Sequence, residues 1–403
     1  MKKRLYKRKI IDEIEKYIET EDIVVLHGAR QVGKTHILYY LKQEFDKKTI
    51  KNLYIDLEDS RFAAILDQGV RSFLNLIKEE GFDLNEKIIV LIDEIQYLKN
   101  PSAFLKLIAD HHKKIKLIVS GSSSFDIKNK FKDSLVGRTV NFEVFNLSFE
   151  EFLDFKGYHF DVKKIYTEKK TEELKDFFRE YTLYGGYPKI VLTDGVEKKE
   201  KYLQQIVDTY VKKDIRDLAK IRDIEKFNKL LEVLASQSGN LLNITEISNT
   251  CRISKATVER YLFIMENTYI LKIVRPYSKN IRSELFRIPK VFFYDSGLMQ
   301  ILWLKNLQRK IIGNVFETAV FSELVKKYRQ ENIFFWRTTD KKEVDFIVKT
   351  ASGALPIEVK INSAQFNKKH IAYFMEKYKI KKGYFVALEG ELTKEDYIYP
   401  WAI

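Results

Sequence analysis

The sequence has almost no cysteine and no long apolar run. Cys251 is the only cysteine among 403 residues, which excludes a disulfide within the chain and a zinc site built from several cysteines. Its helical surroundings predict a small buried residue rather than a nucleophile. No apolar stretch approaches the length of a membrane span. The basic amino terminus meets Asp12, Glu13 and Glu15 where a signal peptide would have its apolar core. We therefore expect a cytoplasmic protein without a membrane partner.

Composition indicates a folded chain of several domains. Hydrophobic residues make up 45% and charged residues 32% of the sequence, which excludes a largely disordered protein. The formal net charge is +14, and residues 201–310 hold 20 basic against 11 acidic side chains. A concentrated positive segment favours polyanionic partners such as DNA. A lysine-rich composition also arises in thermophilic or AT-biased sources, so the charge is supporting evidence only.

A complete phosphate-binding loop stands near the amino terminus. An apolar run, residues 23–26, precedes it and a helical pattern follows, as the motif requires. The backbone N–H groups of such a loop attract phosphates. Its lysine reaches the β- and γ-phosphates, and its last hydroxyl holds Mg²⁺. We expect ATP and Mg²⁺ as cofactors, bound by Gly28, Ala29, Arg30, Gln31, Val32, Gly33, Lys34 and Thr35.

A second apolar run, residues 88–92, ends in two carboxylates. Parallel strands place such ends at the edge of the sheet where ligands bind. Asp93 matches the Walker B carboxylate that supports Mg²⁺. Glu94 can orient and polarise an attacking water, which favours hydrolysis over transfer to a small molecule. The alternative for Glu94 is a solvated strand end.

A third apolar strand, residues 115–119, leads into a serine cluster. In an additional-strand ATPase, this strand lies between the two Walker strands. Ser120 or Ser122 could then sense the γ-phosphate, although serines here also suit a turn. Arg138 is a candidate arginine finger, with an ordinary surface arginine as the alternative. It would act in trans only within a homo-oligomer.

The pattern predicts an α/β multidomain protein with four segments. Residues 1–147 form a doubly wound parallel sheet, and residues 148–224 form a helical lid that begins in a capping box of Ser148 and Glu151. Residues 225–310 suggest a winged helix-turn-helix, and residues 311–403 a further α/β domain.

In the winged-helix segment, Ser254 caps a third helix. Its exposed Lys255, Thr257 and Arg260 would face the major groove of DNA. Residues 269–277 would form a strand and the wing. The alternative is a helical module that packs against the ATPase.

The carboxy-terminal segment contains a predicted hairpin with acids and a lysine. Residues 343–348 alternate as a strand, Ser352-Gly353 supplies the turn, and the following strand places Glu358 and Lys360 on one face. The hairpin would bring Asp345 beside them, and Glu317 on a helix could add an acid. Asp345 and Glu358 could bind Mg²⁺ or Mn²⁺, and the lysine could position water. Charged pairs of this spacing are also common on exposed strands.

These motifs together resemble those of prokaryotic AAA-type P-loop ATPases with a fused carboxy-terminal region of unassigned role. The resemblance covers nearly the whole chain. It implies an ATPase core, a winged helix and a restriction-endonuclease-like domain of the PD-(D/E)XK type. Beyond the loop, it is carried by Asp93-Glu94-Ile95-Gln96, Ser120-Gly121-Ser122-Ser123, Gly137-Arg138, Gly185-Gly186-Tyr187-Pro188, Asp295-Ser296-Gly297-Leu298, Glu343-Val344-Asp345 and Ile357-Glu358-Val359-Lys360.

Three functions remain open from the sequence. The first, which we favour, is Mg²⁺-dependent ATP hydrolysis coupled to DNA-associated carboxy-terminal domains. The second is an ATP-gated, metal-dependent DNA nuclease. The third is a nucleotide switch that acts only through protein partners, against which the positive charge of residues 201–310 argues.

Overall fold

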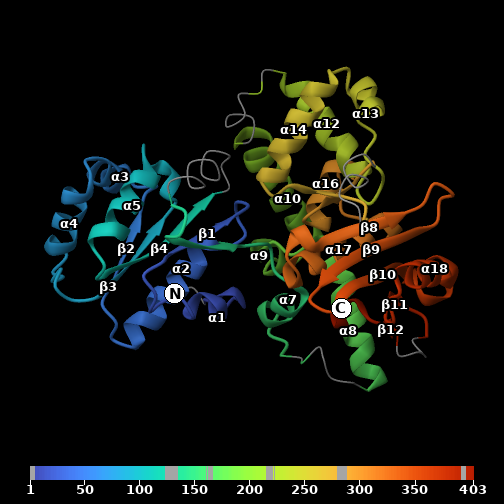
Figure 1. Ribbon diagram of the computed structural model, residues 1–403, viewed down its shortest axis with the longest axis horizontal. Helices are drawn as coiled ribbons and strands as arrows, with labels where there is room; N and C mark the ends of the chain where they lie inside the picture. Colours follow the sequence, from blue (N-terminus) through green and yellow to red (C-terminus); the bar gives the residue numbers. More distant parts are fainter. Residues whose placement is uncertain are drawn as a thin grey trace. The chain divides into compact units, whose positions relative to one another are not determined.

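The computed structural model describes residues 5–122, 135–159, 161, 167–214, 221, 223–278, 288–391 and 396–403. The chain divides into two compact units, residues 1–145 and 146–403 (Figure 1). The expected segments 148–224, 225–310 and 311–403 all lie in the second unit. Across the described part of the chain, no helix is long and apolar enough to cross a membrane.

The first unit is built on a five-stranded parallel sheet in the order β2-β3-β4-β1-β5. The strands are β1 (Ile23–Gly28), β2 (Asn52–Asp56), β3 (Ile88–Asp93), β4 (Ile115–Ser122) and β5 (Thr139–Glu143). The helices described in this unit are α1 (Ile10–Glu15), α2 (Lys34–Lys47), α3 (Ser60–Asp67), α4 (Val70–Glu79), η1 (Ile95–Tyr97, a 3-10 helix) and α5 (Pro101–His111). The prediction that β4 lies between the two Walker strands, β1 and β3, is confirmed.

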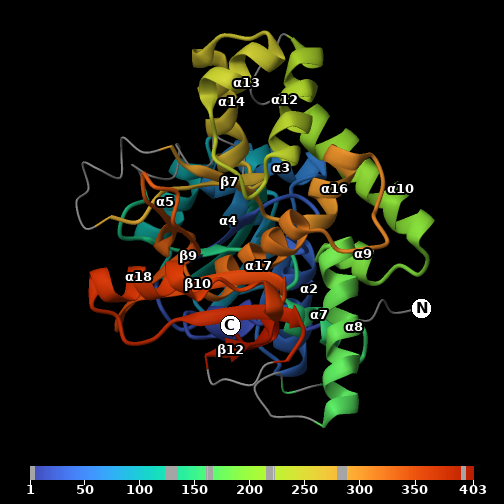
Figure 2. The ribbon, with the colours of Figure 1, turned by 90° about the vertical axis from the view of Figure 1, so that its right-hand side faces the viewer.

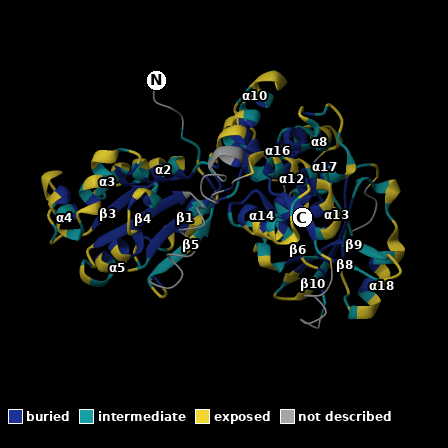
Figure 3. Cartoon of the chain, turned by 90° about the horizontal axis from the view of Figure 1, so that it is seen from above, coloured by how far each residue is buried: buried dark blue, intermediate teal, exposed yellow. Residues whose placement is uncertain are grey.

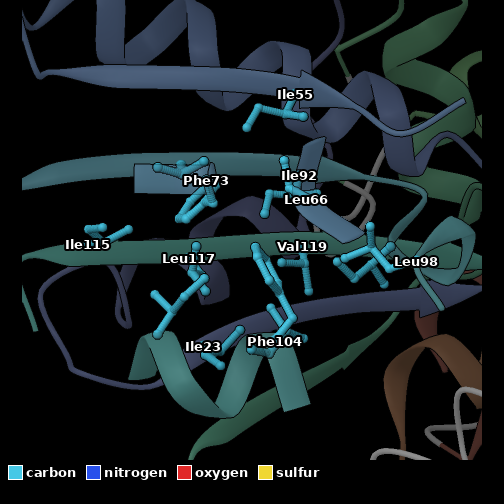
Figure 4. Packing of buried hydrophobic residues seen from close by; sticks show 14 of the residues in the cluster. Ile23, Ile55, Leu66, Phe73, Ile92, Leu98, Phe104, Ile115, Leu117 and Val119 are labelled. Carbon is cyan, nitrogen blue, oxygen red and sulfur yellow. The ribbon is translucent and has the colours of Figure 1, made fainter. Parts of the chain in front are cut away.

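Burial of the strands holds this sheet together. Every residue of β3 is buried, as expected for a parallel strand covered on both faces. Alternate strand residues such as Val90 and Leu117 join side chains from α3, α4 and α5 in one apolar cluster, where Phe73 and Phe104 meet edge to face (Figure 4). The inner strands β1, β3 and β4 are buried and the helices expose their outer faces (Figure 3).

The second unit begins with helices that pack on its later parts. They are α7 (Phe149–Phe155), α8 (Glu168–Tyr184), α9 (Pro188–Val191), α10 (Val196–Ile206) and the π-helical η2 (Val207–Asp214). The predicted capping box is confirmed, because Ser148 and Glu151 each accept a hydrogen bond from the other's backbone N–H. α8 contacts α16 (Ser296–Leu304) and α17 (Gly313–Lys327).

Three helices and the strand β6 follow, as predicted, and β6 pairs with a second strand, β7, that the sequence did not reveal. They are α12 (Ile224–Ser236), α13 (Ile244–Cys251), α14 (Lys255–Asn267), β6 (Leu271–Val274) and β7 (Lys290–Phe293). Cys251 is buried at the end of α13, as expected.

One part of the wing prediction is wrong. Residues 275–277 do not project as a wing but pair with a strand of the carboxy-terminal sheet. The backbone N–H of Tyr277 donates to Phe335 O at 2.6 Å, and that of Phe335 donates to Arg275 O at 3.2 Å. The Tyr277 ring is buried against Phe374, a position that a large aromatic side chain favours over solvent. Residues 279–287 lie outside the described residues.

A five-stranded mixed sheet completes the second unit, in the order β12-β11-β10-β9-β8. Its elements are η3 (Gln330–Asn332), β8 (Ile333–Arg337), β9 (Glu343–Thr350), β10 (Gly353–Asn362), η4 (Ser363–Gln365), α18 (Lys368–Tyr378), β11 (Tyr384–Glu389), β12 (Tyr397–Ile398) and η5 (Pro400–Ala402). The predicted hairpin of β9 and β10 is confirmed. α17 and α18 both lie against β10 (Figure 2).

Candidate functional sites

The phosphate-binding loop connects β1 to α2 as the sequence predicts. Gly33 precedes the helix with a φ of 99°, in the left-handed region that glycine adopts without strain. Gln31 is also left-handed, with a φ of 62°. A side chain on Gly28 would overlap the carbonyl oxygen of Val144, so only glycine fits at the end of β1.

Lys34 points back onto its own loop. Its Nζ donates to Gly28 O at 3.0 Å and to Ala29 O at 2.7 Å. Burial lowers the pKa of Lys34 to about 8, against the opposing effect of Glu94 and Asp93. A phosphate at the loop would raise that pKa again, because it adds negative charge beside the ammonium. The site therefore becomes more cationic when an anion binds.

Asp93 lies buried at the end of β3, and two hydroxyls orient its carboxylate. Tyr54 donates from Oη to Asp93 Oδ2 at 3.1 Å, and Ser120 donates from Oγ to Oδ1. Ser120 is fully buried at the end of β4. Tyr54 is a residue that sequence reasoning missed. Its only signal would be the pairing of β2 with β3, which sets Asp56 opposite Asp93.

Glu94 sits in a strained backbone position next to Asp93. Its φ of 55° is left-handed, which is uncommon for a residue other than glycine. The Glu94 N–H donates to Ser120 Oγ at 3.2 Å, and Gln96 donates from Nε2 to its carboxylate. A strained position held by several partners is typical of functional sites.

The other predicted residues of this unit lie in different places. Thr35 is the second residue of α2 and is half-buried, as is Arg30 in the loop. The Thr35 hydroxyl and the Asp93 carboxylate are hard oxygen donors, the kind that Mg²⁺ prefers, so these residues fit that ion. Ser122 ends β4, but its side chain lies outside the described residues.

Arg138 lies at the opposite edge of the sheet from the loop. The next residue, Thr139, pairs with Ile23 at the start of β1, which places Arg138 six residues, or roughly 20 Å, along the strand from Gly28 at about 3.3 Å per residue. Its guanidinium binds Asp110 at 2.6 Å. The structure does not bring Arg138 to the loop of its own chain.

The carboxy-terminal hairpin brings together an acid and a lysine that the sequence predicted. Asp345 Oδ2 accepts from the backbone N–H of Val359 at 2.8 Å and from Lys360 Nζ at 3.0 Å. Lys360 Nζ also lies 3.0 Å from Glu358 Oε1. β9 also carries a bulge at this point, because residues 345 and 346 together lie opposite the single residue Phe335 of β8.

Lys290 is a member of this cluster that the sequence did not reveal. It comes from β7, its side chain is 4% exposed, and its Nζ lies 2.6 Å from Glu343 Oε1 and 3.5 Å from Glu317 Oε1. Burial alone would lower the pKa of Lys290, but the surrounding acids raise it above its usual value. Asp345 contributes to that effect, so the six charged residues, Lys290, Glu317, Glu343, Asp345, Glu358 and Lys360, form one network.

Burial dominates the titration of two acids here. It raises the pKa of Glu317 to about 7 and that of Glu358 to about 8, with Asp345 acting in the same direction. Both acids therefore hold protons near neutral pH far more readily than exposed glutamates do. Glu317 Oε1 and Glu358 Oε2 are buried and accept no hydrogen bond from any described residue.

The arrangement does not fit a metal ion as it stands. Within the described residues, no three histidine, cysteine, aspartate or glutamate side chains are grouped to hold one. The ammonium groups of Lys290 and Lys360 already lie beside the acids, where a metal cation would otherwise bind. The predicted pair Asp345 and Glu358 is therefore held together by lysine.

The predicted DNA-facing residues lie on α14. Lys255 and Arg260 are exposed and Thr257 is half-buried. Ser254 caps the helix, accepting from the Thr257 N–H at 3.2 Å, as the sequence predicts. The exposed Glu259 on the same helix would oppose phosphates.

Comparison with known families agrees with the geometry of the first unit. Residues 20–153 match a family model described as an AAA domain. Together with the parallel sheet and its helices, this match shows a P-loop AAA-type α/β fold. Residues 175–310 and 312–402 match two models that are each described as a domain of unknown function (DUF8612 and DUF4143).

Similar proteins span most of this chain. The uncharacterized protein MJ1544 of Methanocaldococcus jannaschii is 28% identical over 352 residues, covering 85% of this chain and 76% of that protein. An uncharacterized protein of Haemophilus influenzae is 26% identical over 413 residues, covering 98% and 97%.

Solved structures resemble the chain more distantly. AMPPCP-bound DnaA from Aquifex aeolicus has a TM-score of 0.31 and 16% identity, covering 65% of this chain and 89% of that one. Drosophila ORC bound to DNA has a TM-score of 0.32 and 11% identity, covering 70% and 91%. These low TM-scores support no inference about function.

Proposed function

We propose that the first unit binds ATP with Mg²⁺ and hydrolyses it. The main observation in support is that two motifs lie at the same edge of the sheet, at the carboxyl ends of β1 and β3. The loop with Lys34 ends β1, and Asp93, held by Tyr54 and Ser120, ends β3. An AAA-type fold, which supports nucleotide hydrolysis generally, is consistent with this reaction.

Each residue has a distinct part in this proposal. The loop N–H groups and Lys34 bind the phosphates. Thr35 and Asp93 would hold Mg²⁺, which neutralises charge on the phosphates when bound. Glu94 accepts the proton of the attacking water. Ser120, within reach of both Asp93 and the Glu94 backbone, is the proposed γ-phosphate sensor. Arg138 would act only on the nucleotide of a second copy.

The second unit, in this proposal, associates with DNA through α14. Lys255 and Arg260 are exposed there, and residues 201–310 carry the largest positive excess of the chain. Phosphate contacts by such residues would give affinity that falls with salt. A switch that acts only on protein partners would show no such binding.

A nuclease is the second candidate, favoured by one observation. Asp345, Glu358 and Lys360 meet on adjacent strands, with Glu317 close enough to influence the pKa of Glu358. Lys290 and Lys360 already pair with the acids of this cluster and offset part of their charge, so we rank this function below ATP hydrolysis.

Titration of a fluorescent ATP analogue and a phosphate-release assay test the primary proposal. Lys34→Ala should abolish binding, whereas Lys47→Ala, at the other end of the same helix, should leave it unchanged. Glu94→Gln should bind nucleotide and release phosphate at least about 100-fold more slowly, the scale of a lost general base. Rapid turnover by Glu94→Gln would overturn the role of Glu94, and binding by Lys34→Ala would overturn the site.

A further inference from the structure

Arg8 links the phosphate-binding loop to the point where the chain leaves the first unit. The side chain is buried, at 6% exposed. Its Nη1 donates to Val32 O at 2.8 Å and its Nη2 donates to Phe145 O at 2.9 Å. Val32 belongs to the loop, and Phe145 is the last residue of the first unit. A planar guanidinium holds two acceptors in fixed geometry, so these two carbonyls are tied together.

This contact also orients a phosphate-binding group. The C=O and N–H of one trans peptide point in opposite directions. Arg8 holds the carbonyl of Val32, so the N–H of Gly33 in the same peptide is directed to the other side. The N–H groups of such a loop are the donors that bind phosphates. A change in the orientation of this peptide when phosphate binds would therefore alter the hydrogen bond from Arg8 to Val32 O. Through Arg8, it would also alter the hydrogen bond to Phe145 O.

Each of residues 144–147, which span the boundary between the two units, takes part in a hydrogen bond within its own unit. Val144 donates its N–H to His27 O at 2.7 Å, on the strand that leads into the loop. Phe145 is held by Arg8. On the other side of the crossing, Asn146 donates from Nδ2 to Asp295, and Leu147 donates its N–H to Gly186 O at 2.8 Å. Four successive residues are thus fixed, two to each unit.

The anchor in the second unit is built from two sequence motifs without an assigned role. Asp295 is buried and also accepts the N–H of Gly186 at 2.8 Å. Leu147 O accepts from Tyr181 Oη at 2.9 Å and from Lys326 Nζ at 2.8 Å. A Cβ at Gly186 would lie 2.6 Å from Leu147 O, so glycine is required for this approach.

We propose that Arg8 is a positioning residue that couples the state of the phosphate-binding loop to the second unit through residues 144–147. This inference rests on the proposed ATP binding. In this proposal, the motifs that contain Gly186 and Asp295 respond to the change in the loop. The nucleotide would then alter the hydrogen bonds of Leu147, far along the chain from any residue that touches phosphate.

Hydrogen exchange followed by mass spectrometry tests the coupling in the full-length chain. Exchange is measured with and without AMPPNP and Mg²⁺ in three peptides, which cover the loop, residues 144–150 and residues 181–188. In the wild type, nucleotide should slow exchange in all three, by about 3-fold or more, as for a local opening made less frequent. Nucleotide binding is measured separately by titration.

The variants separate coupling from binding and from folding. Arg8→Ala should bind nucleotide more weakly, because the Gly33 N–H is no longer oriented. At a saturating concentration of AMPPNP its loop should still be protected, but residues 144–150 and 181–188 should no longer respond. Arg61→Ala, which removes an exposed arginine of α3, should respond as the wild type does. Should Arg8→Ala not fold, Arg8→Lys decides, because one ammonium cannot hold both carbonyls in the same geometry and the response should shrink.

Several results would overturn the coupling. A wild type that protects its loop but not residues 144–150 would do so, as would an Arg8→Ala or Arg8→Lys variant with the full response. A wild type that binds no nucleotide in the titration would overturn the proposed function itself, and the inference with it. The titration therefore distinguishes the two failures.

Discussion

Substitution of Glu358 by glutamine should remove much of the pH dependence of stability of the second unit. Burial raises the pKa of Glu358 from an ordinary value of 4.5 to about 8. The folded protein then binds a proton that the unfolded chain has released throughout this range. Stability from this group is fully present below about pH 4.5 and is lost as the pH rises toward 8. Glutamine keeps the shape of the protonated acid but cannot ionise.

The size of the effect follows from linkage. Each extra proton bound by the folded state lowers the free energy of unfolding by about 1.4 kcal/mol per pH unit. As the pH rises from about 6 to 8, the ionisation of Glu358 alone should lower the free energy of unfolding of the wild type by on the order of 2 kcal/mol. Glu317, with its pKa raised to about 7, acts in the same direction. In Glu358→Gln, the pH dependence of stability that Glu317 contributes should also weaken, because Glu317 loses a charged neighbour.

Thermal unfolding of the wild type and Glu358→Gln across this pH range measures the difference. For a unit of this size, 2 kcal/mol corresponds to roughly 4–8 °C in Tm. The two proteins should have similar Tm values near pH 6, and the variant should be the more stable near pH 8. Glu376→Gln, an exposed position on α18, is the matched control and should follow the wild type. Parallel pH profiles for the wild type and Glu358→Gln would refute the reasoning.

Two further predictions concern DNA. Replacing both Lys255 and Arg260 with alanine should weaken duplex binding by about 10-fold at physiological salt and reduce the slope of log affinity against log salt by about 2. Lys226→Ala on α12 should not, and an unchanged affinity in the double variant would remove α14 from the interface. In a plasmid assay with Mg²⁺ or Mn²⁺, with and without ATP, we expect no cutting above the background of Asp345→Ala, because lysines already pair with the acids beside which a metal would bind. Cutting that Asp345→Ala abolishes would establish a nuclease.

The fold of the first unit could be predicted from the sequence because its motifs are local. The loop occupies eight consecutive residues, and each Walker strand is recognisable in the sequence as an apolar run that ends in polar residues. The position of β4 between them followed from the same pattern. Tyr54 could not be predicted, because its contact with Asp93 depends on strand pairing rather than on sequence spacing.

The carboxy-terminal cluster was predictable only within its hairpin. Asp345 and Lys360 meet because a short turn joins β9 and β10, which sequence alternation shows. Lys290 pairs with Glu317 and Glu343 of the same cluster from a strand that ends about fifty residues before the hairpin, and nothing in its local sequence marks it. The wing prediction was wrong for a similar reason. Tyr277 has partners such as Trp336 and Phe374 that lie far along the chain.

Lys290 changes how the acid–lysine pattern should be interpreted. In the sequence, Glu317, Asp345, Glu358 and Lys360 form a set with excess negative charge, which would favour a divalent cation. In the structure, the buried Lys290 offsets part of that charge, and the raised pKa values of Glu317 and Glu358 provide protons as further compensation. Any metal would have to displace those protons, so its binding would strengthen as the pH rises. A metal that binds would therefore oppose the loss of stability expected between pH 6 and 8, and the same unfolding experiment would detect it.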